Sequence, residues 1–406
     1  MKWAMLALVS AIFFVSTGGA FSSLGVLLPA MISDLGWNWT QGGAGFTVLA
    51  LMTGLSSTLP AYTIRIGGMR LTYLSGGLIL GGGFASLSAA DGMFAYILGA
   101  GLVGVGYSQV ASVPAVKLLS GWFPERRSLL IGLFFACGAL GSVVGPLAAS
   151  FFLGVLESWR LYWVCLAGLV TSLCLVAAYL VYEKADQVDG GADGESAVSK
   201  GAEWTLQETL RSPQYYIIVI GLTATLLGAI TMNTWQVTHM RNLDVSANIA
   251  AGALSAHAMF NALSRAVGGA VIDRLGAKWL FATGLGAGVV GMLALSVAKS
   301  PLLIALFAVG DGYSFGIVTF SSAILLLNYY GAKNSPAILG TMNLISTLAM
   351  TGPIVAGRIA DVTGEFTSVF VGIAAILAAA SAFAVWMPKP EKSGASLERK
   401  DEAPAS

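Results

Sequence analysis

Charged side chains are scarce in this sequence, and their scarcity excludes whole classes of protein. Asp, Glu, Lys and Arg make up 10% of the 406 residues, whereas soluble domains carry roughly 25%. A shortage of this size excludes an ordinary water-soluble enzyme. The formal net charge is +1 and no basic run precedes the tail, so no surface for nucleic acid is expected either.

Cysteine and histidine are also rare, at three and two residues. Cys137, Cys165 and Cys174 all lie within apolar runs, and their spacing fits neither a metal site nor a disulfide framework. Packing is the better interpretation of each. Two histidines are too few for a histidine-rich metal site, so we expect neither a metal nor another cofactor.

Long apolar runs take the place of the missing charge. Hydrophobic residues make up 56% of the chain. The uncharged stretch from Trp3 to Ser33 far exceeds the core of a signal peptide, which has about 7–15 residues, and so predicts a retained membrane helix. A run of roughly 20 apolar residues is long enough to span the hydrocarbon core as a helix. Lipid offers no hydrogen bonds, so the backbone N–H and C=O groups must bond to one another within the segment, as they do in a helix. Eleven more such runs follow, at about 41–62, 71–90, 93–119, 128–155, 159–182, 213–239, 247–271, 279–298, 301–329, 335–357 and 366–387.

The predicted fold class is therefore an all-α integral membrane protein with twelve transmembrane helices in two six-helix bundles. A polar, acidic segment at 183–212 links the bundle at 1–182 to the bundle at 213–387, and a polar tail follows at 388–406. Within the linker, the stretch from Trp204 to Arg211 is expected to form a short amphipathic helix on the inner surface of the membrane.

The distribution of basic residues predicts the orientation. With a cytoplasmic amino terminus, sixteen Lys and Arg residues fall on the inner side and four, Arg160, Arg241, Lys299 and Arg358, on the outer side. Cytoplasmic segments carry an excess of basic residues, so both termini are expected to be cytoplasmic. We expect a multi-pass protein of the cell membrane (the inner or plasma membrane), surrounded by lipid. Arg265 is the one basic residue left inside a crossing.

Related patterns occur at the same place in the two halves, between the second and third predicted helix. The second copy runs from Gly269 to Lys278, with Asp273, Arg274 and Gly276 around its turn. The first copy runs from Ile64 to Arg70. Glycine permits a tight turn in such a loop, and the basic groups anchor it at the lipid headgroups.

The stretch from Gly141 to Pro146 in the predicted fifth helix has the spacing Gly-x-x-x-Gly-Pro, in which small residues allow close helix contact and proline bends the helix. Together with the two loops, this pattern resembles the major facilitator superfamily. The resemblance implies a two-bundle transporter in which the loop residues Asp273, Arg274 and Gly276 have a gating role. The first loop departs from the family pattern, because Ile64 stands where the family usually has aspartate.

A narrower resemblance rests on three segments. Gly36-Trp37, the run from Asn261 to Arg265, and the run from Tyr313 to Gly331 are similar to the monocarboxylate and oxalate–formate transporter branch of the superfamily. This resemblance implies that Arg265 binds the carboxylate of the substrate. It also favours Tyr107 as a wall of the pocket, because the branch has a tyrosine in this part of the fourth helix.

Three features of that branch are missing here. Asn261 replaces an aspartate of the animal carriers, and the first crossing has no lysine. Asn343, Ser346 and Thr347 stand where the oxalate exchanger has a second cation. A single cation in the predicted cavity suits a monocarboxylate better than a dicarboxylate.

Arg265 is the leading candidate for substrate binding on physical grounds alone. It lies about 12 Å from Asp273 along a helix that rises ~1.5 Å per residue, well inside the bilayer. A lipid-facing arginine there costs roughly 2.5–3.5 kcal/mol, so we expect it to face a cavity. The planar guanidinium of arginine presents a fork of two parallel N–H donors, which matches the two oxygens of a carboxylate. The alternative is a fixed ion pair or backbone contact that holds helices together.

Asn261 and His257 lie four and eight residues before Arg265, so the three share one broad helix face. Asn261 can bind the substrate or only a neighbouring helix, and His257 can relay a proton or be an ordinary buried histidine. Asp311 falls near the bilayer middle in the predicted tenth helix. Burial favours the neutral form of a carboxyl group and a nearby arginine favours the charged form, so Asp311 can couple transport to protons or pair permanently with Arg265.

The predicted function is secondary active transport of a small organic monocarboxylate, coupled to protons, by alternating access. Tyr107 and Tyr313 are the expected aromatic walls of the substrate site. The expected partners are the anion and a proton, and a monomer is compatible with this function. An organic-anion exchanger of the oxalate–formate kind and a proton-coupled drug exporter of the same fold stay open as alternatives. No enzyme is predicted, because no convergent set of acids, histidines or a nucleophile is present.

Overall fold

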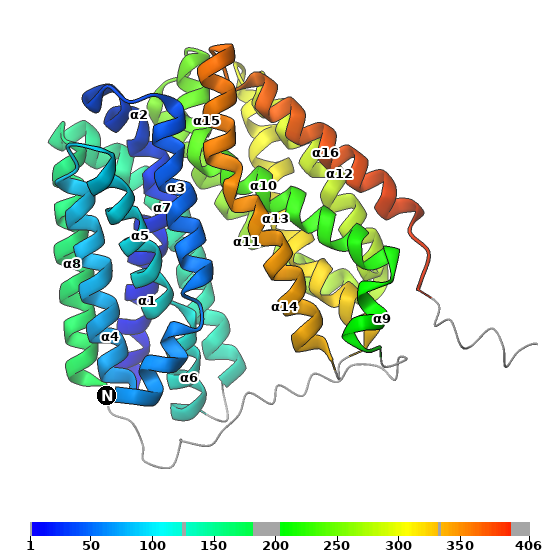
Figure 1. Ribbon diagram of the computed structural model, residues 1–406, viewed down its shortest axis with the longest axis horizontal. Helices are drawn as coiled ribbons and strands as arrows, with labels where there is room; N and C mark the ends of the chain where they lie inside the picture. Colours follow the sequence, from blue (N-terminus) through cyan, green and yellow to red (C-terminus); the bar gives the residue numbers. More distant parts are fainter. Residues whose placement is uncertain (1, 124–126, 182–203, 332–333, 391–406) are drawn as a thin grey trace, which may run out of the picture.

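The computed structural model describes residues 2–123, 127–181, 204–331 and 334–390, and this part of the chain contains helices and no strand. The helices form two groups that stand side by side (Figure 1). The first group contains α1 Lys2–Thr17, the π-helical turn η1 Gly18–Ser22, α2 Ser23–Leu35, α3 Trp39–Leu55, α4 Leu59–Ser88, α5 Met93–Val110, α6 Ser112–Trp122, α7 Arg127–Leu156 and α8 Trp159–Leu180.

The second group follows in the chain. It contains α9 Leu206–Leu210, α10 Pro213–Asn242, α11 Ala247–Leu275, α12 Ala277–Ser296, α13 Pro301–Tyr330, α14 Ser335–Ser346, the 3₁₀ turn η4 Thr347–Thr351, α15 Gly352–Thr363 and α16 Thr367–Trp386. In Figure 1, α1 begins and α8 ends at the lower end of the molecule, where α9 also lies. We call this the linker end and the opposite end the far end.

Ten helical segments in the described chain are long and apolar enough to cross a membrane. The other two crossings are α3, which has 17 residues, and α11, which carries His257, Asn261 and Arg265. Both pack against the other group, α3 on α15 and α11 on α7, so part of their surface meets protein rather than lipid. With these two the helices make twelve crossings, and the predicted fold class is confirmed.

Most predicted crossings agree with the observed helices to within a few residues, but four differ. The predicted crossing at 41–62 ends early, at Leu55, and the predicted crossing at 71–90 begins early, because α4 starts at Leu59. The crossing at 93–119 is divided at Ala111 into α5 and α6. The crossing at 335–357 consists of α14, η4 and α15 in succession and runs on to Thr363.

Glycines make the predicted turns between the second and third crossing of each half. Gly276 separates α11 from α12 with a φ of 79° and a ψ of 141°, a conformation that a residue with a Cβ rarely adopts. In the first half, Gly67 and Gly68 interrupt the helical backbone of α4, and Gly68 has a φ of 69°. The turns that the two loops predict are therefore present.

The predicted short helix of the linker is present as α9. Thr205 and Glu208 form a capping box at its start. Trp204 is only 7% exposed, and its ring centroid lies 5.3 Å from that of Tyr330, so this segment packs against the end of α13 instead of lying on lipid. Residues 182–203 of the predicted linker and 391–406 of the predicted tail lie outside the described residues.

Close packing at the glycines of α7 is also as predicted. A Cβ added to Gly141 would lie 2.2 Å from the carbonyl oxygen of Phe14, and one added to Gly145 would lie 2.8 Å from the Cα of Gly18. Only glycine fits at such distances, so α7 crosses α1 and η1 backbone against backbone. Pro146 follows within α7.

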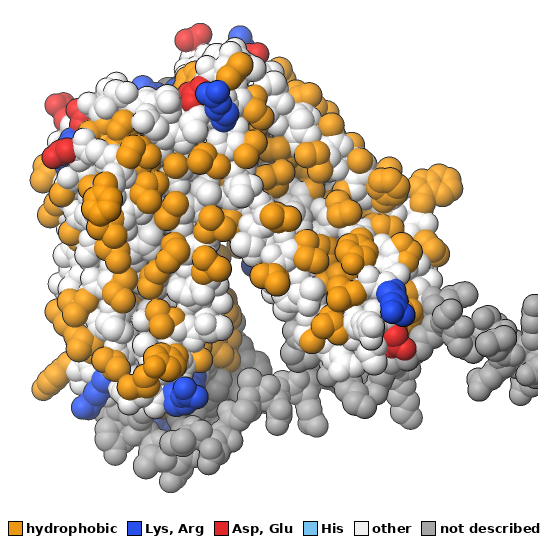
Figure 2. All heavy atoms as spheres, in the orientation of Figure 1, with side chains coloured by type: hydrophobic (Ala, Val, Ile, Leu, Met, Phe, Trp, Pro, Cys, Tyr) orange, Lys and Arg blue, Asp and Glu red, His pale blue; other side chains and the backbone are white. Residues whose placement is uncertain are grey.

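The two groups are joined at the far end. The carboxylate of Asp361 on α15 accepts the backbone N–H groups of Trp39 at 2.9 Å and Thr40 at 3.0 Å, together with the Thr40 hydroxyl. Nearby in the same interface, the Ser150 hydroxyl of α7 donates to Asn248 of α11 at 2.8 Å. Towards the linker end the space-filling view shows a hollow between the groups (Figure 2). The molecule is therefore closed at the far end and open at the linker end.

Candidate functional site

Arg265 lies on a stripe of α11 that is buried near the far end and exposed nearer the linker end. Leu254, Ala258 and Arg265 follow one another at intervals of four and seven residues, which places them on one side of the helix. Leu254 is 1% exposed and Ala258 is 9% exposed, whereas Arg265 is exposed. Burial along this stripe therefore falls from the far end towards the linker end, where the two groups are open to each other.

No carboxylate pairs with Arg265 in the described part of the chain. Its contact is with Phe315 of α13, whose ring centroid lies 5.6 Å from the guanidinium carbon. The permanent pair with Asp311 that the sequence left open is not formed, because Asp311 lies against His257 instead. A guanidinium without a carboxylate partner can accept one from a ligand through two parallel hydrogen bonds.

His257 and Asp311 form a close pair of titratable side chains inside the second group. Nε2 of His257 lies 3.0 Å from Oδ2 of Asp311, and the two side chains are 3% and 4% exposed. The two atoms are close, but their directions do not meet hydrogen-bond geometry. The rings of Phe307 and Phe315 lie nearly parallel to the imidazole, with centroids 6.0 and 6.4 Å away. Ionisable groups inside membrane helices are costly, and by default they indicate a function.

Small residues bring three helices close enough to enclose this pair. A Cβ on Gly312 of α13 would lie 2.6 Å from the carbonyl oxygen of His257, and one on Gly316 would lie 2.4 Å from that of Asn261. From the other side, a Cβ on Gly291 of α12 would lie 2.5 Å from the backbone nitrogen of Asp311. Backbones therefore meet directly, in the way that small residues permit in membranes.

Two more polar atoms beside the pair have no hydrogen-bond partner in the described chain. They are Oδ1 of Asn261 and Oγ of Ser314. Asn261 lies one turn after His257 on α11, and Ser314 lies three residues after Asp311 on α13, so each is a neighbour of the pair along its helix. Buried polar atoms are satisfied almost everywhere in proteins. The cluster can therefore hold a proton, a water molecule or a polar group of a ligand.

Tyr107, on α5 of the first group, packs against the first crossing. Its hydroxyl lies 3.3 Å from Oγ1 of Thr17, and its ring meets Phe21 of η1 edge to face at 5.0 Å. Interruptions of this π-helical kind are frequent at functional sites, and the sequence reasoning missed this one. The sequence offered only the glycine pair Gly18-Gly19; that Gly18 meets the backbone of Gly141, with a Cβ that would lie 2.7 Å from its carbonyl oxygen, is seen only in the structure.

Tyr313 is not brought together with Arg265. Its hydroxyl lies 3.3 Å from Oγ1 of Thr283 on α12. Tyr313 is two residues from both Asp311 and Phe315, which is roughly 200° around a helix of 3.6 residues per turn. It therefore points away from the side of α13 that faces α11.

The loop motif is described in part. Gly276 makes the turn, and Arg274 is exposed beside it. The side chain of Asp273 lies outside the described residues. The gating role of these three residues stays a prediction.

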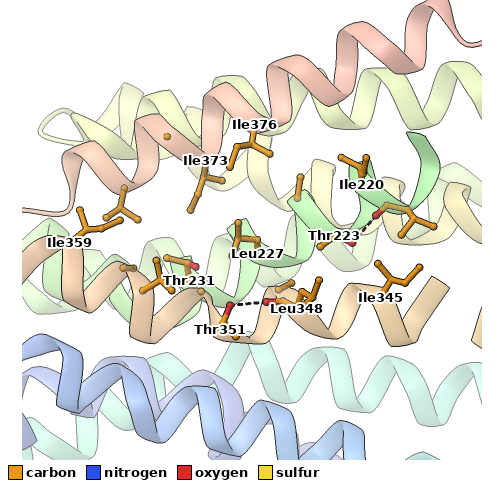
Figure 3. Close-up of a pocket in the computed structure, with 18 of the residues that line it drawn as sticks. Ile220, Thr223, Leu227, Thr231, Ile345, Leu348, Thr351, Ile359, Ile373 and Ile376 are labelled. Carbon is orange, nitrogen blue, oxygen red and sulfur yellow. Dashed lines mark hydrogen bonds between the residues drawn. The ribbon is translucent and has the colours of Figure 1, made fainter. Parts of the chain in front are cut away.

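A separate apolar cavity of about 560 Å³ lies in the second group between α10, α14 to α15, and α16 (Figure 3). Leu227, Leu348 and Ile373 point into it, and Thr223 and Thr231 add hydroxyl groups. Among the residues that the structure describes, no charged side chain lines the cavity, and neither does any residue of the predicted substrate site. It therefore offers no cationic partner for an anion.

Comparison with known proteins extends over the whole chain. The model of the Major Facilitator Superfamily matches residues 8–241 and 217–406. Monocarboxylate transporter 13 of Bos taurus is 25% identical over 79% of this chain and 74% of its own. The oxalate:formate antiporter of Oxalobacter formigenes is 25% identical over 78% of this chain and 82% of its own.

Two solved structures share the fold at lower identity. One is a bacterial homolog to the human lysosomal transporter Spinster in an inward-facing and occupied conformation, with a TM-score of 0.78, 14% identity, and coverage of 95% of this chain and 96% of that one. The other is the nucleoside transporter NupG, with a TM-score of 0.72, 15% identity, and coverage of 96% and 99%.

Proposed function

This chain belongs to the major facilitator superfamily, and from that premise we propose that it carries a small organic monocarboxylate across the membrane together with a proton. As a multi-pass membrane transporter it is not an enzyme. The similarity to monocarboxylate transporters and to an oxalate:formate antiporter supports an organic anion as the substrate class.

The observation that carries the proposal is the exposed guanidinium of Arg265. Once the site closes around it during transport, an unpaired charge is costly, and so is an isolated carboxylate, whereas the two together are tolerable. The planar fork of arginine fits a carboxylate, and the ring of Phe315 beside it offers an apolar surface for the rest of a small acid. Asn261, on the same helix face, is the proposed second polar contact.

The proposed proton site is the pair formed by His257 and Asp311. The pair can gain or lose one proton while it stays enclosed between α11, α12 and α13. Binding of a monoanion at Arg265 together with one proton at the pair leaves the net charge of the carrier unchanged. The empty carrier and the carrier with both substrate and proton bound would therefore have the same net charge when they change conformation. Transport would be electroneutral.

The proposed movement is a rocking of the two groups, residues 1–182 and 213–387, about the site between them. The described state is open at the linker end. With both termini in the cytoplasm, as the basic residues predict, this state faces inward. The substrate is expected to leave or enter by the hollow in Figure 2.

Competition binding to the purified protein tests the substrate class. With one cation at the site, acids of the lactate and pyruvate type should compete better than oxalate, whose second carboxylate would stay unpaired. Tight oxalate binding without competition from any monocarboxylate would overturn the monocarboxylate proposal. It would favour instead an exchanger like the oxalate:formate antiporter.

Uptake by proteoliposomes tests the role of Arg265. Arg265→Lys keeps the charge but loses the fork, so one charge-assisted hydrogen bond worth about 1.5–3 kcal/mol is lost, and kcat/KM should fall roughly 10- to 100-fold. Arg241→Lys is the matched control, because Arg241 is exposed near the end of α10. If kcat/KM falls equally in both variants, or does not fall in Arg265→Lys, Arg265 does not bind the substrate.

A pH gradient tests the coupling. Asp311→Asn should abolish gradient-driven accumulation but leave exchange of labelled for unlabelled substrate, because the anion site is intact. Asp244→Asn is the control; Asp244 is exposed and has a φ of 65°, which asparagine tolerates. Normal accumulation by Asp311→Asn would show that the residue is structural. Export of a cationic drug by the wild type, with no anion uptake, would support the drug-exporter alternative.

A further inference from the structure

A second cavity lies at the linker end of the second group, away from the hollow between the groups. It has a volume of about 650 Å³ and forms where α12 begins, α13 ends and the chain leaves α16. Its walls carry basic, amide, aromatic and apolar side chains from these three helix ends. Because the ends of three membrane helices meet here, the cavity lies at the level where lipid headgroups meet the protein.

The charge at this cavity has one sign. Lys278 and Lys389 line it, and no acidic side chain of a described residue does. α12 also starts here without a side-chain cap, so the positive end of its dipole faces the same region. Asn328, exposed near the end of α13, adds an amide that can donate hydrogen bonds.

The remaining walls are aromatic and apolar. Trp279 is 54% exposed and Tyr329 is partly buried, and tryptophan and tyrosine are typical of the membrane–water interface. Leu325, Met387 and Ala277 are at most 5% exposed and form an apolar floor. A soluble anion would gain nothing from the exposed ring of Trp279, whereas the upper acyl carbons of a lipid would bury apolar surface against it.

We propose that this cavity binds the headgroup of an anionic phospholipid. Its phosphate would lie between Lys278 and Lys389, near the start of α12, with the glycerol region against Leu325 and Met387. Basic pockets between membrane helices on the cytoplasmic side are suited to such headgroups. The site is independent of the substrate proposal, because its lining includes none of Arg265, Asn261, His257 and Asp311.

Native mass spectrometry of the full chain, released from nanodiscs, tests the proposal. Discs of phosphatidylglycerol mixed with phosphatidylcholine should yield protein that retains phosphatidylglycerol selectively. Each lysine near an anionic surface contributes about fivefold to affinity, so Lys278→Gln with Lys389→Gln should weaken retention roughly thirtyfold. Lys299→Gln is the matched control, because Lys299 is an exposed lysine in the far-end loop between α12 and α13.

The outcomes separate the possible ligands. Equal retention of the two lipids by the wild type, or unchanged selectivity in the double variant, would overturn the proposal. Displacement of the lipid by millimolar inorganic phosphate or glycerol phosphate would show a site for free phosphate instead. If the double variant unfolds, Lys389→Gln alone, at an exposed position after α16, should still lower retention about fivefold.

Discussion

Asp361→Asn should open the far end of the molecule. The carboxylate of Asp361 lies at the amino end of α3 and belongs to the other group of helices, so its bonds to Trp39 and Thr40 join the two groups directly. A negative charge at this end of a helix is also favoured by the helix dipole. Asparagine has nearly the same shape but no charge, and only its side-chain oxygen can accept hydrogen bonds.

The size of the effect follows from the three bonds. Hydrogen bonds to a charged group contribute about 1.5–3 kcal/mol and those between neutral groups about 0.5–1.5 kcal/mol. The dipole adds roughly 0.3–1 kcal/mol. Asparagine keeps one acceptor, so we expect a loss of about 2 kcal/mol from the state closed at the far end. The ratio of that state to the state open at the far end should therefore fall roughly thirtyfold.

Distance measurements between spin labels can detect this shift. Asp91 and Lys299 are exposed in far-end loops of the first and second group, and cysteines placed there would carry the labels. The three native cysteines would first be replaced by alanine. Asp361→Asn should add a population with a longer distance between the labels. Glu365→Gln, an exposed acid that follows α15, should leave the distances unchanged.

The same measurement can refute the reasoning. If Asp361→Asn and the parent protein give the same distances, the contact with α3 does not hold the far end closed. If Glu365→Gln lengthens the distance as much as Asp361→Asn does, general loss of negative charge is the cause. A shift in the opposite direction would mean that the carboxylate destabilises the described state.

Three further substitutions test the packing. Gly145→Val should reduce the yield of folded protein in size-exclusion chromatography, because its Cβ would lie 2.8 Å from the Cα of Gly18. Gly154→Val on the same helix is the control and should be tolerated, because a Cβ there would meet nothing within 4 Å. Gly276→Ala should lower stability by about 1–3 kcal/mol in thermal unfolding because of its positive φ, and an unchanged midpoint would contradict this. Trp235→Phe removes a 2.9 Å hydrogen bond to a carbonyl of α15 and should cost about 1 kcal/mol by the same assay; no shift would show that the bond is unimportant.

Most crossings could be predicted from the sequence because their length and hydropathy decide them, whereas α3, with 17 residues, and the more polar α11 fall short by these two measures. Composition does not show where a helix breaks, and the divisions at Ala111 and at η4 were missed for that reason. A close helix contact of α7 was predictable, because Gly141 and Gly145 are four residues apart on one face, but its partner α1 was not. The end at which the molecule is open depends on contacts between the groups, such as that of Asp361, and no local pattern shows these.

The candidate site was predicted residue by residue but not as an arrangement. Asp311 was considered as a partner of Arg265, yet its neighbour in the structure is His257. Which partner it meets depends on the rotation and separation of α11 and α13, which the contacts at Gly312 and Gly316 determine. The four-residue spacing of these glycines was visible in the sequence, but it shows only that a helix comes close, not which helix.

Under the proposed function, enclosure of the His257–Asp311 pair prevents a proton leak. In the described state Arg265 is exposed, whereas the side chains of the pair are 3% and 4% exposed. A pair open to the same hollow would load and release protons whether or not substrate was present. Phe315 lies beside both Arg265 and the ring of His257. A carboxylate that turns Arg265 away from Phe315 would change the packing over the pair, so substrate and proton would be linked without direct contact between the two charged sites.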